Sequence, residues 1–262
     1  MTLIRQPAVA GMFYPGDASS LQQQLEDFLA HATPEPEHPK ALIVPHAGYI
    51  YSGPVAASAY RLLYEMRDQI TRVVLLGPSH RLAFTGIAAT SMEYFSTPLG
   101  LVRIDREAVD DVLELPQVRV IDEAHREEHS LEVQLPFLQS VLGEDFGLVP
   151  LVVGDADSAS VGEVIERLWG GRETLIVISS DLSHYHDYES ARQLDSATSR
   201  AIEQLNPQAI AYEQACGRNP VNGLLVAARH HGLQARTLDL RNSGDTAGGR
   251  DRVVGYGAYA FV

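Results

Sequence analysis

Long apolar runs alternate with mixed apolar and polar segments along this chain. Four runs are almost continuous in Val, Ile and Leu, at 41–45, 72–77, 147–153 and 174–179. Runs of this length and composition are typical of β-strands covered on both faces. The closing VVGYGAYAFV alternates in character and predicts an antiparallel or edge strand.

The segments between these strands have a helical period. Residues 18–30 place Leu21, Leu25 and Leu29 on one stripe, and Asp17 is well placed as the N-cap. Further helices are predicted at 54–67, 106–114, 158–169, 188–205 and 220–231. Such alternation predicts an α/β fold with a central, mostly parallel, mixed sheet flanked by helices on both faces.

The composition is that of an ordinary globular protein with one core. The chain has 262 residues, of which 45% are hydrophobic and 21% charged. No Pro-, Gly- or Ser-rich linker separates two halves, and HATPEPEHPK (31–40) is interpreted as a surface loop. We therefore expect a single domain over residues 1–262.

The charge balance and the distribution of apolar residues exclude several classes of function. With 20 Lys and Arg against 34 Asp and Glu, the net charge of -14 argues against binding to nucleic acid or an anionic membrane. The N-terminal stretch has no long apolar core, and no apolar run approaches the roughly 20 residues needed to span a bilayer. The single cysteine, Cys216, excludes an internal disulfide. These features predict a cytoplasmic protein.

Histidines follow three of the strand-like runs. ALIVPHAGY contains His46, RVVLLGPSH ends at His80, and TLIVISSDLSH ends at His184. In open α/β sheets the ligand site lies beyond the carboxyl ends of the strands. We therefore expect the three imidazoles to converge on one crevice.

A pair of imidazoles with an anionic third ligand can bind iron or copper and leave positions open for substrate. His46 and His80 form the first pair. A lone histidine at a strand end more often forms a hydrogen bond with a loop carbonyl, but two histidines at equivalent strand ends favour a metal site. Cys216 in ACGRNPVNG could complete the set as a soft thiolate, which favours copper, iron or zinc over magnesium or calcium. The alternative for Cys216 is a small buried apolar side chain.

The loop SSDLSHYH (179–186) adds Asp181, His184 and His186. His184 could be a further metal ligand or a general acid/base whose tautomer a carboxylate such as Asp181 holds. The simpler alternative is that Asp181 caps the following helix.

The segment HREEHSLEVQLPFL spells a pattern of one zinc-peptidase class with His125, Glu128 and His129. That mechanism needs both histidines on one helical face. The following helix is predicted to begin at Ser130, where Pro136 would already strain it, so the pattern would straddle a loop. A zinc hydrolase is therefore the least favoured function, although His129 can still face the crevice.

Several motifs together resemble one family. AGMFYP, PHAGYIYSG, LLGPSH, EEHSLEVQLPFL, VISSDLSHY, CGRNPV and VVGYGAYAF occur in the order typical of the Memo family, from about residue 7 to the end. That family is similar in fold to the catalytic subunit of extradiol ring-cleaving dioxygenases of the protocatechuate 4,5-dioxygenase type, which use non-haem Fe(II). The resemblance implies the same single α/β domain.

The resemblance also implies residue roles. His46 and His80 match the two metal-binding histidines, and Cys216 falls where the dioxygenases supply a carboxylate. His184 matches their acid/base histidine, and His129 resembles another histidine beside the active site.

Asp181 is the remaining polar candidate on the substrate side. Because a thiolate replaces a carboxylate, ring cleavage is not inherited from the fold. Eukaryotic relatives are associated with iron or copper, redox activity and phosphorylated receptor peptides, and prokaryotic members with a radical-SAM protein. We expect a metal-dependent redox protein using Fe(II) or copper, with zinc a further candidate. The alternative is a non-catalytic protein that binds a peptide or small ligand in the same crevice.

Overall fold

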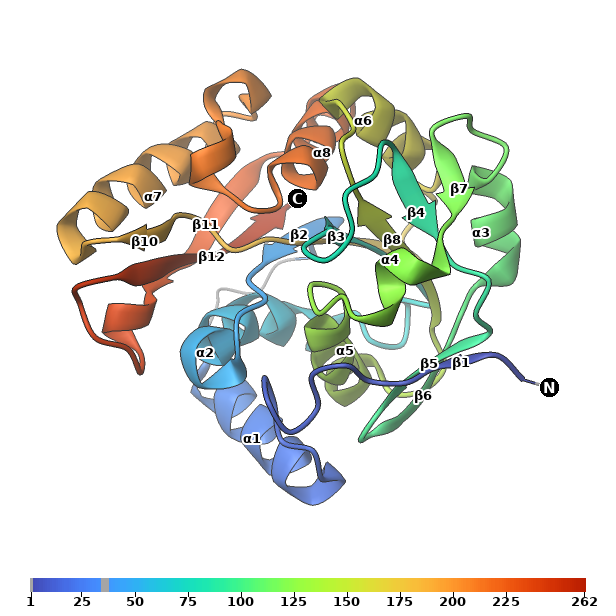
Figure 1. The fold of residues 1–262 in the computed structure, drawn as a ribbon, viewed down its shortest axis with the longest axis horizontal. Coiled ribbons are helices and arrows are strands. Elements are labelled where there is room, and N and C mark those ends of the chain that lie inside the picture. The colour runs from blue at the N-terminus through green and yellow to red at the C-terminus, as the bar shows by residue number, and fades with distance from the viewer. Residues whose placement is uncertain (1, 34–37) are drawn as a thin grey trace.

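A nine-stranded mixed sheet forms the centre of the molecule (Figure 1). The computed structural model describes residues 2–33 and 38–262, so the predicted loop at 31–40 lies partly outside the described residues. Four adjacent, parallel strands form the middle of the sheet: β2 (Ala41–Val44), β9 (Thr174–Ser179), β3 (Arg72–Pro78) and β8 (Gly147–Val153). Nearly every residue in them is buried, as their continuous apolar composition predicts.

Shorter and antiparallel strands extend the sheet on both sides. On one side β12 (Val253–Phe261) pairs antiparallel with β2 and carries β10 (His184–His186) and β11 (Ala235–Asn242). On the other side β4 (Ile87–Ala89) pairs antiparallel with β8 and carries β7 (Val118–Val120). The closing strand is thus antiparallel, as predicted, and lies inside the sheet rather than at its edge.

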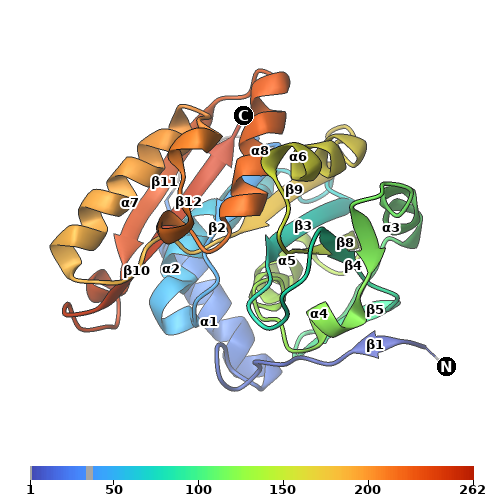
Figure 2. The ribbon, with the colours of Figure 1, turned by 45° about the horizontal axis from the view of Figure 1, so that its top comes forward.

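Helices cover both faces of the sheet, which confirms the predicted α/β class (Figures 1 and 2). One face carries α6, α7 and α8, and the other carries α1, α2 and α5. The helices are α1 (Ala18–His31), α2 (Tyr49–Tyr60), α3 (Arg106–Val112), α4 (Asp122–Arg126), α5 (Leu135–Leu142), α6 (Ser158–Arg167), α7 (Tyr188–Glu203) and α8 (Arg218–His230). Asp17 caps α1 by accepting from the Ser20 amide, as predicted. No helix in the described ranges is both long and apolar enough to cross a bilayer.

Two helix starts differ from the prediction, and a proline explains each. The helix predicted from residue 54 begins at Tyr49, and Pro54 lies in its second turn, where it removes one backbone hydrogen bond without ending the helix. The helix predicted from Ser130 begins at Leu135, so that Pro136 falls in its first turn, where the missing N–H has no cost.

A buried ion pair fixes the N-terminal segment across one end of the sheet. Arg5 donates to Glu132 at 2.8 Å, and Glu132 also accepts from the Tyr14 hydroxyl at 2.7 Å. β1 (Ile4–Arg5) joins a separate small sheet with β5 (Tyr94–Thr97) and β6 (Gly100–Arg103). The segment after β1 brings the centroid of the Phe13 ring to 4.9 Å from that of the His129 ring, so Phe13 lines one side of the site described next.

Candidate metal centre

Three polar side chains emerge together from the carboxyl ends of the central strands. His46 lies two positions beyond the end of β2, Asp181 two beyond β9, and His80 two beyond β3. Because these three strands are adjacent and parallel, with β9 in the middle, their ends meet at one edge. The predicted convergence of His46 and His80 is therefore observed, and their ring centroids are 5.2 Å apart.

Cys216 reaches the same place from the loop before α8. Its Sγ lies 3.3 Å from His46 Nε2, and one donor atom each from His46, His80 and Cys216 lie within 4.8 Å of one another. Gly217 permits this approach, because a Cβ there would lie 2.6 Å from Ser180 Cβ. We refer to His46, His80 and Cys216 as the strand-end cluster.

Hydrogen bonds fix the tautomer of His46. The Ser179 hydroxyl donates to the Ser130 carbonyl and accepts from Gln134 Nε2 at 2.8 Å, so its remaining lone pair must accept from His46 Nδ1, 2.9 Å away. Gln134 is itself oriented by the Tyr60 hydroxyl, which donates to its Oε1 at 2.9 Å. His46 therefore carries its proton on Nδ1 and presents the Nε2 lone pair toward Cys216.

Glu128 fixes His80 in the same way. Its carboxylate accepts from His80 Nδ1 at 2.8 Å and from the His80 backbone N–H at 2.6 Å. It also accepts from the backbone N–H groups of His129 and Ser130 at 3.0 and 2.9 Å. Burial tends to raise the pKa of Glu128, but these hydrogen bonds outweigh it and lower the pKa to about 2. His80 is thus left with a free Nε2 lone pair.

The donor set fits a soft or borderline transition metal. Two imidazole nitrogens and one thiol converge, and each imidazole is held by an outer hydrogen-bond partner, as in metal sites generally. Burial holds the pKa of His46 well below its usual range, so this ring stays neutral. Burial, assisted by the Asp181 charge, raises the pKa of the Cys216 thiol, and binding of a cation would displace its proton.

His129 and Asp181 lie beside the cluster. The His129 ring stacks on the His80 ring at 4.6 Å and lies 5.5 Å from the His46 ring. Its Nδ1 is buried and lies 3.5 Å from Glu128 Oε1. Asp181 uses Oδ1 to accept from the His46 backbone N–H at 2.7 Å, and its Oδ2 lies 4.0 Å from His46 Nε2. Burial raises the pKa of Asp181.

His184 begins β10, close enough for its charge to act on His46 and Asp181, but it belongs to none of the potential metal-ligand groups of the described residues. Its Nδ1 donates to the Leu182 carbonyl at 2.9 Å, which leaves the Nε2 lone pair available. Tyr185 follows with a φ of 64°, a left-handed conformation that is costly for a large side chain and common at functional sites. The structure places His186 at the other end of β10, paired with β12.

The zinc-peptidase pattern is divided by the fold. His125 is buried at the end of α4, with its Nε2 3.0 Å from the Ala88 carbonyl, and belongs to none of the potential ligand groups in the described residues. Glu128 and His129 instead turn toward His80. The sequence showed Glu128 only as part of the zinc-peptidase pattern, and it gave no sign that Ser179 orients His46. Glu128 is far from His80 along the chain, and Ser179 is far from His46, so no local motif contains either pair.

Comparison with known proteins agrees with these motifs. The model of the family described as Memo-like protein matches residues 5–260. A MEMO1 family protein of Aquifex aeolicus is 37% identical, covering 99% of each chain. One from Aeropyrum pernix is 39% identical over 97% of this chain and 98% of its own, and one from Nitrosopumilus maritimus is 33% identical over 99% and 100%.

A solved structure supports the fold independently. The crystal structure of the uncharacterized protein JW3007 from Escherichia coli K12 superposes with a TM-score of 0.53, covering 84% of this chain and 99% of that one. The two sequences are 13% identical, so this likeness concerns the fold alone.

Proposed function

This chain belongs to the Memo family, and from that premise and the geometry of the strand-end cluster we propose that it is a metal-dependent redox protein. The observation that supports the proposal is the convergence of the two imidazoles and the thiol, with the His46 and His80 tautomers fixed by Ser179 and Glu128. Iron as Fe(II) or copper suits this donor set best, and zinc is a further candidate.

The ligands and the protein around them have separate tasks. When bound, iron or copper would supply redox chemistry and Lewis acidity at the strand-end cluster. His46, His80 and Cys216 hold the ion. His184 takes a proton from the substrate at its Nε2, because its Nδ1–H is already engaged by the Leu182 carbonyl.

His129 and Asp181 complete the substrate side. The His129 ring is held between His80 and Phe13 with its Nδ1 3.5 Å from Glu128, so its Nε2 is the atom that can form a hydrogen bond to a bound molecule. Asp181 fixes the turn that carries His46 and directs its second oxygen toward the same centre. Their proposed role is to orient the substrate.

Metal analysis tests the ligand set. Protein prepared without oxygen or affinity-tag metals should contain about one iron or copper per chain, since folding pre-orients the three ligands. His46→Ala, His80→Ala and Cys216→Ser should each lose the metal, whereas His31→Ala, an exposed histidine of α1, should retain it. A wild-type protein that stays empty after anaerobic addition of Fe(II) and Cu(I) would overturn the proposal.

His184→Ala tests the proton transfer. This variant should retain its metal and lose turnover by roughly 10²–10⁴-fold, the usual contribution of a general acid or base. O2 consumption with catechol-like compounds is the first assay, and His186→Ala is the matched control. Loss of metal in His184→Ala would instead make His184 a ligand.

The alternative is a protein that binds a peptide or small ligand in the same crevice without turnover. It predicts that ligand affinity survives chelation of the metal, whereas the redox proposal predicts that affinity falls. The cytoplasmic location and the radical-SAM partner stay predictions.

A further inference from the structure

A cleft opens directly beside the strand-end cluster. Its volume is about 550 Å³, which lies in the range of small-molecule sites. His80 and Cys216 both line it, so a molecule in the cleft reaches two of the proposed metal ligands. Leu82 and Phe84 give it an apolar wall, and Arg218 lines it near the start of α8.

Arg218 makes no ion pair in this cleft with any described residue. Within the part of the chain that the structure describes, its guanidinium forms no hydrogen bond or ion pair, and its one contact is the face of the Tyr212 ring, 5.7 Å from the guanidinium carbon to the ring centroid. Asp155 also lines the cleft, but it is exposed and makes no ion pair with Arg218.

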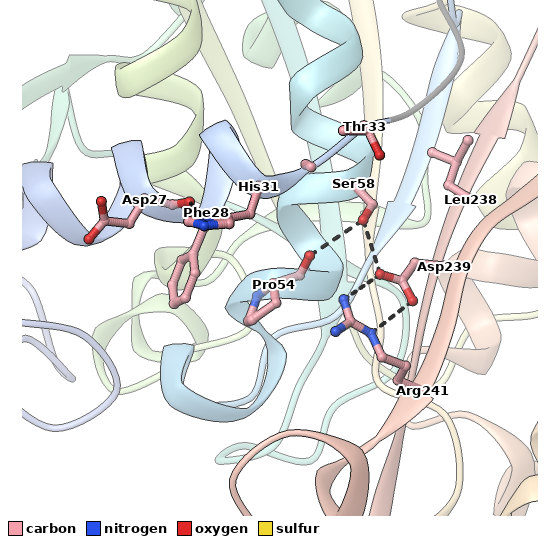
Figure 3. Close-up of a pocket in the computed structure, with 10 residues that line it drawn as sticks. Asp27, Phe28, His31, Thr33, Pro54, Ser58, Leu238, Asp239 and Arg241 are labelled. Carbon is pink, nitrogen blue, oxygen red and sulfur yellow. Dashed lines mark hydrogen bonds and ion pairs between the residues drawn. The ribbon is translucent and has the colours of Figure 1, made fainter.

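Another pocket of similar volume holds an arginine that is paired with an acidic residue. It lies between α1, α2 and β11, has a volume of about 580 Å³, and contains Arg241 (Figure 3). There Arg241 Nε donates to Asp239 at 2.9 Å, and the same carboxylate accepts from the Ser58 hydroxyl at 3.0 Å. Arg241 is thus paired with an acidic side chain, whereas Arg218 forms no ion pair among the described residues.

From this contrast we infer that the cleft binds a small organic acid, with its carboxylate on Arg218 and its apolar body against Phe84 and Leu82. A planar guanidinium matches a carboxylate with two parallel hydrogen bonds, and the Tyr212 ring limits its movement. The opposite end of the ligand then faces His80 and Cys216. This inference rests on the proposed function only for the end of the ligand that faces His80 and Cys216, because the contact between the carboxylate and Arg218 needs no metal.

Benzoate and its neutral analogue benzamide provide the test. Binding of both is measured by calorimetry on metal-loaded and on metal-free protein, for wild type, Arg218→Gln and Arg218→Lys, with Arg229→Gln of the same helix as the control for charge. One charged hydrogen-bonded contact should favour benzoate over benzamide by about tenfold or more in the wild type. Arg218→Gln should remove that preference, Arg218→Lys should keep part of it, and Arg229→Gln should keep all of it.

Two results would overturn the inference. One is equal affinity of the wild type for benzoate and benzamide, and the other is an equal loss of affinity for both in Arg218→Gln, which would indicate a distorted cleft rather than a lost charge. The metal content of Arg218→Gln should equal that of the wild type. A wild type that takes up neither Fe(II) nor Cu(I) but still prefers benzoate through Arg218 would reject the redox proposal and leave this inference intact.

Discussion

Replacing Glu128 by Gln removes the group that orients His80 while nearly preserving its shape. The carboxylate is 1% exposed and accepts four hydrogen bonds, two of them from His80. A glutamine has one acceptor oxygen, so its amide N–H₂ would face a donor of His80. Because three of the four donors meet Oε1, the amide oxygen would take that position and the N–H₂ would face the His80 backbone N–H, so the turn that carries His80 would shift and its Nε2 would no longer point steadily at the cluster.

The magnitude follows from how such outer partners act on metal ligands. Loss of one typically lowers metal affinity about 10–100-fold, and we expect Glu128→Gln to fall in that range. The assay is competition with a chelator of known affinity under anaerobic conditions, with thermal unfolding recorded in parallel. Glu127→Gln, an exposed neighbour with the same change of charge, should bind metal like the wild type.

A double-mutant cycle isolates the mechanism. If Glu128 acts through His80, then Glu128→Gln should cause little further loss of metal affinity in a His80→Ala background. An equal loss in both backgrounds would refute the orienting role. A zinc hydrolase would give the opposite result, with metal retained in Glu128→Gln and hydrolysis abolished.

Three further predictions concern residues around the site. Burial lowers the pKa of His125 to about 4, below its unfolded value of 6.5. The free energy of unfolding should therefore fall by about 3 kcal/mol as the pH is lowered from above 6.5 to about 4, because the unfolded state takes up the proton first. His125→Gln should remove this part of the acid sensitivity, as measured by urea titrations. Glu132→Gln should lower the free energy of unfolding by about 3–5 kcal/mol, because it leaves Arg5 buried without its partner, and a loss below about 1 kcal/mol would contradict this account. Gly217→Ala should weaken metal binding with a small change in unfolding temperature, since its Cβ would collide with Ser180 and displace the start of α8; unchanged chelator competition would refute it.

The main elements of the fold could be predicted because their signal is local. The four central strands and the helix at 18–30 were found within about two residues, since a continuous apolar run and a helical stripe are both set by burial of neighbouring positions. The strands β1, β4, β7 and β10 have two or three residues, too few for any period, and their partners are distant in sequence. The starts of α2 and α5 were misplaced because a proline is compatible with more than one position near a helix start.

For the site, the sequence alone determined which chemical groups stand at strand ends. His46, His80 and Asp181 each follow an apolar run, and a parallel sheet brings such ends to one edge. Only the tertiary structure decided that Cys216, 170 positions from His46, joins them, and that Glu128 orients His80 rather than serving with His125. It also decided that Arg218 has no acidic partner in the described ranges 2–33 and 38–262. The physical reason is separation along the chain. Periodicity reflects which of several neighbouring residues are buried, whereas the geometry of hydrogen bonds and metal ligands depends on strand order and on how loops from distant segments pack.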